Sequence, residues 1–165
     1  VMDVGGVRVG FFALMGANEL TTAKPPEGIE FRSQDVISTA QRIVPELRKQ
    51  AEVVVLLSQM SPQETDDLLR KVSGIDAALY GRNPGWKERA EKVGTTITQQ
   101  TGLRGQYAGQ LVLIVDPEGR IADWGSRNFA FDAKIPENPE IAAAVKVVDS
   151  QARELLKSET NRKSS

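Results

Sequence analysis

The sequence predicts an α/β fold: a mixed sheet of parallel β-α-β units followed by an antiparallel hairpin, with flanking helices. Apolar runs of strand length alternate with stretches of helical periodicity through residue 80, which implies parallel strands joined by right-handed crossovers. Two later apolar runs flank Asp116-Pro117-Glu118-Gly119, a turn in which proline is preset for the second position. A last amphipathic stretch predicts a C-terminal helix.

The expected strands are apolar runs bounded by turn residues. Val7–Met15 follows a Gly5-Gly6 turn and is rich in strand formers. Glu52–Leu57 ends in a continuous β-branched and leucine run, as in a parallel strand buried on both faces. The remaining expected strands are Ile75–Tyr80, Thr95–Gln99, Leu111–Asp116 and Arg120–Phe131.

Two helices are expected between the first strands. The spacing of apolar residues predicts a helix over Gln34–Gln50, kinked at Pro45. Ser61-Pro62-Gln63-Glu64 is a capping box with proline at the first helical position, so a second helix begins there and stops at Ser73-Gly74. Asp66-Asp67 then lies near the start of this helix, where negative charge suits the helix dipole, and we interpret it as structural.

The predicted organisation has three parts. Residues 1–135 form one domain, residues 136–158 form a C-terminal helix that packs on it, and residues 159–165 form a disordered polar tail. The helix opens at Asn138-Pro139-Glu140. Its apolar stripe comprises Ile141, Val145, Val148, Ala152 and Leu155.

The chain contains neither histidine nor cysteine, and this absence removes whole classes of chemistry. Zinc sites of the Cys/His type, thiol nucleophiles, disulfides and Ser-His-Asp triads are excluded. A net charge of −1, without long blocks of either sign, argues against a nucleic-acid partner. The apolar runs are too short to cross a membrane. Because the sequence starts at Val1, we expect a processed segment of a longer product.

Three segments, in order, carry a resemblance to a known family. Val53–Met60 is similar to a strand that ends in Leu-Ser-His, and Gly74–Pro84 to a Gly-Ile-Asp strand that ends in Gly-His-x-His. Gln99–Leu111 is similar to a Gln-Ala-Gly segment followed by a Gly-x-Leu strand. Together with the Asp116–Gly119 turn, they resemble the C-terminal half of the calcineurin-like metallophosphoesterase domain of 5'-nucleotidases. The resemblance covers about Val4–Phe131.

This resemblance implies half of a two-sheet sandwich from an enzyme that hydrolyses phosphoesters with two divalent metal ions. Where the family has metal-binding histidines, this sequence has Gln59, Arg82 and Pro84. Glutamine offers only a neutral amide oxygen, arginine carries a permanent positive charge, and proline offers no side-chain ligand. The family's other ligands lie in an N-terminal half that this sequence does not contain. We therefore expect no catalytic residue, no metal ligand and no cofactor in this chain.

Three functional hypotheses follow. The replacement of the family's metal-binding histidines favours a degenerate, non-catalytic domain with a structural, binding or assembly role. An alternative is the C-terminal portion of a metal-dependent nucleotide hydrolase whose remaining ligands lie in the absent half. A third is a phosphate- or nucleotide-binding module without turnover, with Arg82 and Arg104 as anion-binding residues. The plainer interpretation of both arginines is a solvated loop.

The resemblance also implies partners. A lone half-sandwich leaves an apolar sheet face larger than soluble monomers usually expose. We expect a homodimer, a C-terminal helix over that face, or a missing N-terminal half or second domain. A periplasmic or secreted location is suggested by the resemblance alone.

Overall fold

A six-stranded sheet is the frame of the first of two units. The computed structural model describes residues 1–16, 27–30, 32–82, 85–102, 105–132 and 134–163, with the backbone alone for residues 157–163. The chain divides into two compact units, Val1–Ala130 and Phe131–Ser165, and the predicted domain organisation stays a prediction. None of the helices in the described part combines the length and the apolar character that a bilayer crossing requires.

The sheet confirms the predicted mixed α/β class. Its strand order is β1-β2-β3-β4-β6-β5. The four central strands, β2, β3, β4 and β6, run parallel, and the edge strands β1 and β5 run antiparallel to their neighbours. The strands are β1 (Met2–Val4), β2 (Val7–Met15), β3 (Val53–Gln59), β4 (Ala77–Tyr80), β5 (Glu91–Val93) and β6 (Thr96–Gln100).

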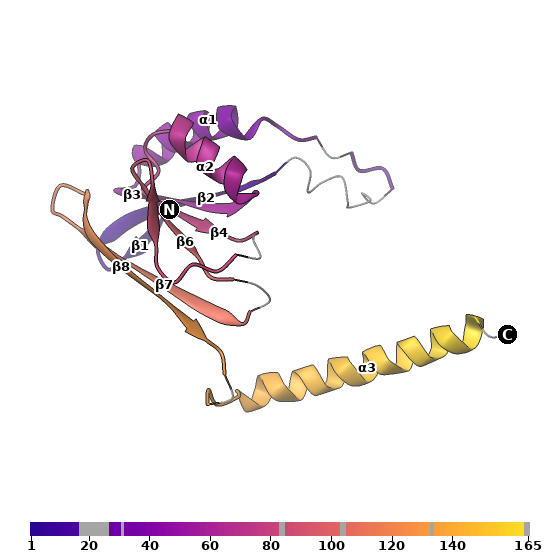
Figure 1. The fold of residues 1–165 in the computed structure, drawn as a ribbon. Coiled ribbons are helices and arrows are strands. Elements are labelled where there is room, and N and C mark those ends of the chain that lie inside the picture. Colours follow the sequence, from indigo (N-terminus) through magenta and orange to yellow (C-terminus); the bar gives the residue numbers. More distant parts are fainter. Residues whose placement is uncertain (17–26, 31, 83–84, 103–104, 133, 164–165) are drawn as a thin grey trace. The chain divides into compact units, whose positions relative to one another are not determined.

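Two helices, α1 (Val36–Arg48) and α2 (Pro62–Lys71), lie on one side of the sheet (Figure 1). The Asp35 side chain caps α1 by accepting from the Ser38 N–H at 2.8 Å. The predicted capping box of α2 is confirmed. Between helices and sheet lies the larger core, whose buried members include Phe12, Leu14, Ala40, Val44, Val54, Leu56, Met60, Leu68 and Ile75.

The hairpin forms a separate two-stranded sheet of β7 (Tyr107–Val115) and β8 (Ile121–Ala130). The Asp116 carbonyl accepts from the Gly119 N–H at 2.9 Å, and Gly119 has a φ of 80°, as the predicted turn requires. The hairpin packs on the sheet face opposite the helices. A second, smaller core forms there from Val53, Val55 and Ala77 with the partly buried Val7, Val9, Leu111, Leu113, Val115 and Ile121.

Arg48 ties α1 to the sheet. Its guanidinium donates to the carbonyls of Gly74 and Glu52 and, at 2.5 Å, to the Asp76 carboxylate. Asp76 also accepts from the Val54 N–H at 2.7 Å. The aspartate of the Gly74-Ile75-Asp76 segment therefore joins α1, β3 and the start of β4, and its role in this chain is structural.

The observed bounds differ from the predicted ones in informative places. β3 runs on to Gln59, and β7 begins at Tyr107, four residues before the predicted start. The edge strands β1 and β5 were not predicted, because three residues are too few to show a periodicity. The kink expected at Pro45 stays a prediction, although this proline does lie inside α1.

The second unit contains one long helix, α3 (Pro139–Lys163). Its first turn is capped by Asn138, whose side chain accepts from the Glu140 N–H at 2.9 Å. The helix runs through most of the segment for which a disordered tail was expected. Ile141, Val145 and Val148 remain exposed within this unit, and packing of α3 on the sheet stays a prediction.

Neighbouring leucines in β3 test the difference between the two faces of the sheet. We expect Leu56→Ala to lower the free energy of unfolding by about 2–5 kcal/mol, because Leu56 is fully buried under the helices. Leu57→Ala should cost less than about 1.5 kcal/mol, since 41% of Leu57 is already exposed. Urea unfolding of both variants measures the difference, and equal losses would contradict this two-faced assignment.

Candidate functional site

The carboxyl edge of the sheet brings together two of the predicted site residues. β3 and β4 pair with Ser58 opposite Tyr80, so Gln59 and Gly81 follow as neighbours. The Gln59 Oε1 atom lies 2.9 Å from the point where a Cβ on Gly81 would stand. Arg82 comes next and is exposed. Pro84 and Arg104, the other predicted positions, lie outside the described residues.

The carboxylates near this edge are engaged in structural contacts. Glu64 accepts from the N–H and the hydroxyl of Ser61 at 3.0 and 2.7 Å, and these bonds, with the charge of Arg82, lower the pKa of Glu64. Asp66 accepts from the Tyr80 hydroxyl and faces Arg70, which also pairs with Asp67. In the described part of the chain, no three His, Cys, Asp or Glu side chains cluster as metal ligands would.

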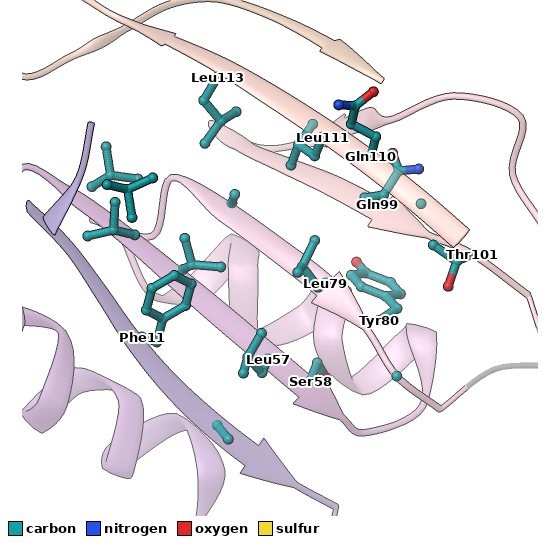
Figure 2. A pocket seen from close by; sticks show the side chains of 18 of the residues that line it. Phe11, Leu57, Ser58, Leu79, Tyr80, Gln99, Thr101, Gln110, Leu111 and Leu113 are labelled. Carbon is teal, nitrogen blue, oxygen red and sulfur yellow. The ribbon is translucent and has the colours of Figure 1, made fainter. Parts of the chain in front are cut away.

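A cavity of about 920 Å³ lies beside this edge, between the sheet and β7. Figure 2 shows Leu111 and Leu113 of β7 pointing toward the sheet, while Phe11 and Leu57 lie beyond the cover of the hairpin. We call the lining of this cavity by β2, β3, β4 and β7 the open apolar face. It includes no charged residue among the described ones, and its principal members are Val9, Phe11, Ala13, Val55, Leu57, Leu79, Leu111 and Leu113.

Several side chains of the open apolar face are exposed to solvent. Phe11, Leu57 and Leu79 are 39%, 41% and 36% exposed, although each points to the same side of the sheet as the buried Val55 and Ala77. The hairpin therefore covers only part of the face. Exposed apolar surface that continues a buried core is typical of an interaction site.

Polar contacts fix the hairpin over one end of the sheet. The Asn128 side-chain nitrogen donates to the backbone carbonyls of Gln100, at 2.9 Å, and Lys87, so its oxygen is left to accept from Gln99 Nε2 at 2.8 Å. Gly109 lies so close to Thr101 that a Cβ would come within 2.0 Å of the Thr101 methyl carbon. A larger residue at position 109 would push β7 away from β6.

The residues of the open apolar face were not singled out in the sequence, although an exposed sheet face was expected. The available signal was the apolar character of alternate residues in β2, namely Val7, Val9, Phe11 and Ala13. The other face of β2 begins with Arg8 and Gly10 but is apolar at Phe12 and Leu14, so no single periodicity stands out over the whole strand. Which residues stay uncovered depends on where the hairpin packs.

Comparison with protein-family models and with curated proteins gives no match. Among solved structures, the chain is similar to the sulfate thiohydrolase SoxB of Thermus thermophilus, with a TM-score of 0.79 and 23% identity over 93% of this chain and 28% of that chain. It is also similar to a 5'-nucleotidase precursor from the same species, with a TM-score of 0.73 and 20% identity over 94% of this chain and 34% of that chain.

A third similar structure is the NAD nucleotidase of Haemophilus influenzae, with a TM-score of 0.62 and 17% identity over 90% of this chain and 32% of that chain. The chain thus spans about a third of the length of these proteins. The likeness shows that it shares the fold of one part of each.

Tyr80 provides a pH test of the contacts at the carboxyl edge. Burial, together with its hydrogen bond to Asp66, raises the pKa of Tyr80 well above the ordinary 10.0. The folded chain keeps this proton at a pH where the unfolded chain loses it, so stability falls as pH rises above about 10. We expect Tyr80→Phe to show a shallower loss in urea unfolding between about pH 9 and 11. Identical slopes for both proteins would contradict the assignment.

Proposed function

We propose that this chain is a degenerate part of a nucleotidase-type metallophosphoesterase fold, with a role in assembly instead of hydrolysis. The chain matches about a third of SoxB and of the nucleotidases, and its sequence resembles the C-terminal half of the 5'-nucleotidase metallophosphoesterase domain. The open apolar face is the observation that carries the proposal. It has the composition of a protein interior and lacks a complete cover.

The chemistry at the carboxyl edge supports a non-catalytic role. Gln59 and Arg82 stand where the resembling family has histidines; Gln59 offers only a neutral amide oxygen, and Arg82 offers no lone pair to a cation. The charge of Arg82 acts on the Glu64 carboxylate, whose oxygens already serve the capping box of α2. A metal ion bound by the Glu64 carboxylate would compete with the hydrogen bonds that Glu64 accepts from Ser61, and so would disrupt the capping box of α2.

We assign the open apolar face to the remainder of a longer polypeptide, of the kind that the similar structures contain. Those chains are about three times as long as the part matched here. A second copy of this chain or the helix α3 could cover the open apolar face instead. The tests below distinguish these alternatives. An anion site at Arg82 ranks lower, because the charge of Arg82 acts on the Glu64 carboxylate.

The first test concerns metal and turnover. We expect the purified chain to bind neither Mn²⁺ nor Zn²⁺ stoichiometrically in calorimetry and to leave an aryl phosphate unhydrolysed, because the carboxylates described near the carboxyl edge are engaged and the chain has no histidine. Titration with inorganic phosphate and with a nucleoside monophosphate, on wild type and Arg82→Ala, tests the anion site in parallel. Tight stoichiometric metal binding with turnover would contradict the proposal.

The second test places a charge on the open apolar face. Ala13 is exposed and lines the cavity, so Ala13→Arg should leave the free energy of unfolding of the isolated chain within about 1 kcal/mol of wild type. It should weaken binding to the polypeptide encoded directly before Val1 by at least about 100-fold, because an unpaired charge would be buried. The matched control, Gln41→Arg, adds the same charge on an exposed position of α1 and should bind as wild type.

A pull-down followed by calorimetry measures both variants. If Ala13→Arg and Gln41→Arg bind equally well, the open apolar face is not the docking surface. Light scattering on the isolated chain tests whether a second copy covers the face instead. In that case the wild-type chain is a dimer, and Ala13→Arg dissociates it.

A further inference from the structure

A smaller cavity, of about 270 Å³, lies at the amino edge of the sheet, where β4 and β6 begin. The end of α1, the edge strand β5 and the turn end of the hairpin complete its walls. It shares no described residue with the open apolar face, and four of its nine lining residues are charged. We call this cavity the basic pocket. Its lining consists of Arg48, Asp76, Lys92, Thr95, Ile97, Gly119, Arg120, Ile121 and Trp124.

One positive charge in the basic pocket has no compensating carboxylate. The carboxylates in the pocket and beside its turn pair with arginines: Asp76 with Arg48, Asp116 and Glu118 with Arg120, and Glu52 with Arg8. Lys92 has no carboxylate partner among the described residues, and its ammonium lies 4.4 Å from the centre of the Trp124 ring. A charge on the wall of a partly enclosed pocket attracts an anion more strongly than a charge on an open surface.

Arg48 adds hydrogen-bond donors to this charge. Its Nε, Nη1 and Nη2 atoms each donate one bond, to the carbonyls of Gly74 and Glu52 and to the Asp76 carboxylate. A guanidinium has five N–H groups, so one N–H on each terminal nitrogen has no acceptor among the described residues. The Arg48 side chain is 30% exposed and lines the basic pocket. These two N–H groups are therefore available to an occupant.

The remaining walls offer apolar surface and one hydroxyl. Ile97 is buried in β6, while Ile121 and Trp124 of β8 are half-buried. The Thr95 hydroxyl makes no hydrogen bond within the described part of the chain. An occupant that matches these walls has an apolar body beside its charged group. A carboxylate is the matching charge, because it is a planar acceptor for guanidinium N–H groups and brings one negative charge to the single uncompensated ammonium.

We propose that the basic pocket binds a small organic carboxylate with an apolar body. The carboxylate accepts hydrogen bonds from the Lys92 ammonium and from the free N–H groups of Arg48, and the body packs on Ile97, Ile121 and Trp124. The inference goes beyond the proposed function and is independent of it, because the basic pocket and the open apolar face lie at different places in the unit.

Benzoate and benzamide are matched probes, since both carry the same ring and only benzoate carries a charge. We expect benzoate to shift the amide NMR signals of the basic-pocket residues saturably, with a dissociation constant of about 1 mM at neutral pH. Benzamide should bind at least about tenfold more weakly, because it lacks the charge-assisted hydrogen bonds. Equal affinity for both probes overturns an anion site. Without saturable shifts by benzoate at these residues, the proposal is wrong.

Lys92→Gln tests the uncompensated charge. Lys92 is exposed on an edge strand, so the variant should fold, and benzoate should bind at least about tenfold more weakly while benzamide binding stays unchanged. The matched control, Lys71→Gln, removes the same charge from the exposed end of α2 and should bind benzoate as wild type. Equal benzoate binding by both variants would show that the basic pocket is not the site.

Two further titrations complete the test. Inorganic phosphate that binds as tightly as benzoate overturns the role of the apolar body and identifies an inorganic oxyanion instead. Ala13→Arg alters only the open apolar face and should bind benzoate as wild type. Failure of docking on that face therefore leaves the benzoate result unaffected, and failure of benzoate binding leaves the proposed function unaffected.

Discussion

The middle strands β3 and β4 of this sheet are apolar on both faces, and this constraint governs the rest of the structure. Val54 and Leu56 of β3 point to the helices, and Val55 and Leu57 point the other way. A strand of this kind requires a covering layer on each side. Two helices complete one layer. A two-stranded hairpin begins the other and leaves a cavity of about 920 Å³ at its open side.

Internal polar contacts have taken over the groups that could otherwise serve chemistry. Asp76 binds Arg48 and a strand amide, Asp66 binds a buried tyrosine, and Glu64 closes the cap of α2. Each contact fixes one element against another, so these three carboxylates are already engaged, whereas the buried Oε1 atom of Gln99 in β6 has no hydrogen-bond partner. Most of the lining that the hairpin leaves uncovered is apolar, and this favours a role in binding a partner.

Local chemistry allowed much of the fold to be predicted from the sequence. The capping box of α2, the apolar run of β3 and the Asp116–Gly119 turn each depend on adjacent residues, and all three are confirmed. β7 was predicted too short because its first residues, Tyr107–Gln110, are not an apolar run and include a glycine. That glycine is set by the proximity of Thr101, a contact between residues eight positions apart.

The candidate site was predictable in part for the same reason. Parallel neighbours end at the same edge of a sheet, so the placement of Gln59 beside Gly81-Arg82 follows from strand order. The cavity does not follow in this way, because its lining comes from strands far apart in sequence and its open side depends on how far the hairpin reaches. No pattern of neighbouring residues in the sequence indicates how far the hairpin extends over the sheet.

The composition of the open apolar face argues that it is an interior surface. Charged residues make up 26% of the whole sequence, yet none is found among the described residues that line the cavity. A face in contact with water would tolerate charge at Ala13 or Leu57 at little cost to this unit, because both side chains are already exposed. The absence of charge is explained when the open apolar face is covered, because a charged side chain there would then be buried without a partner.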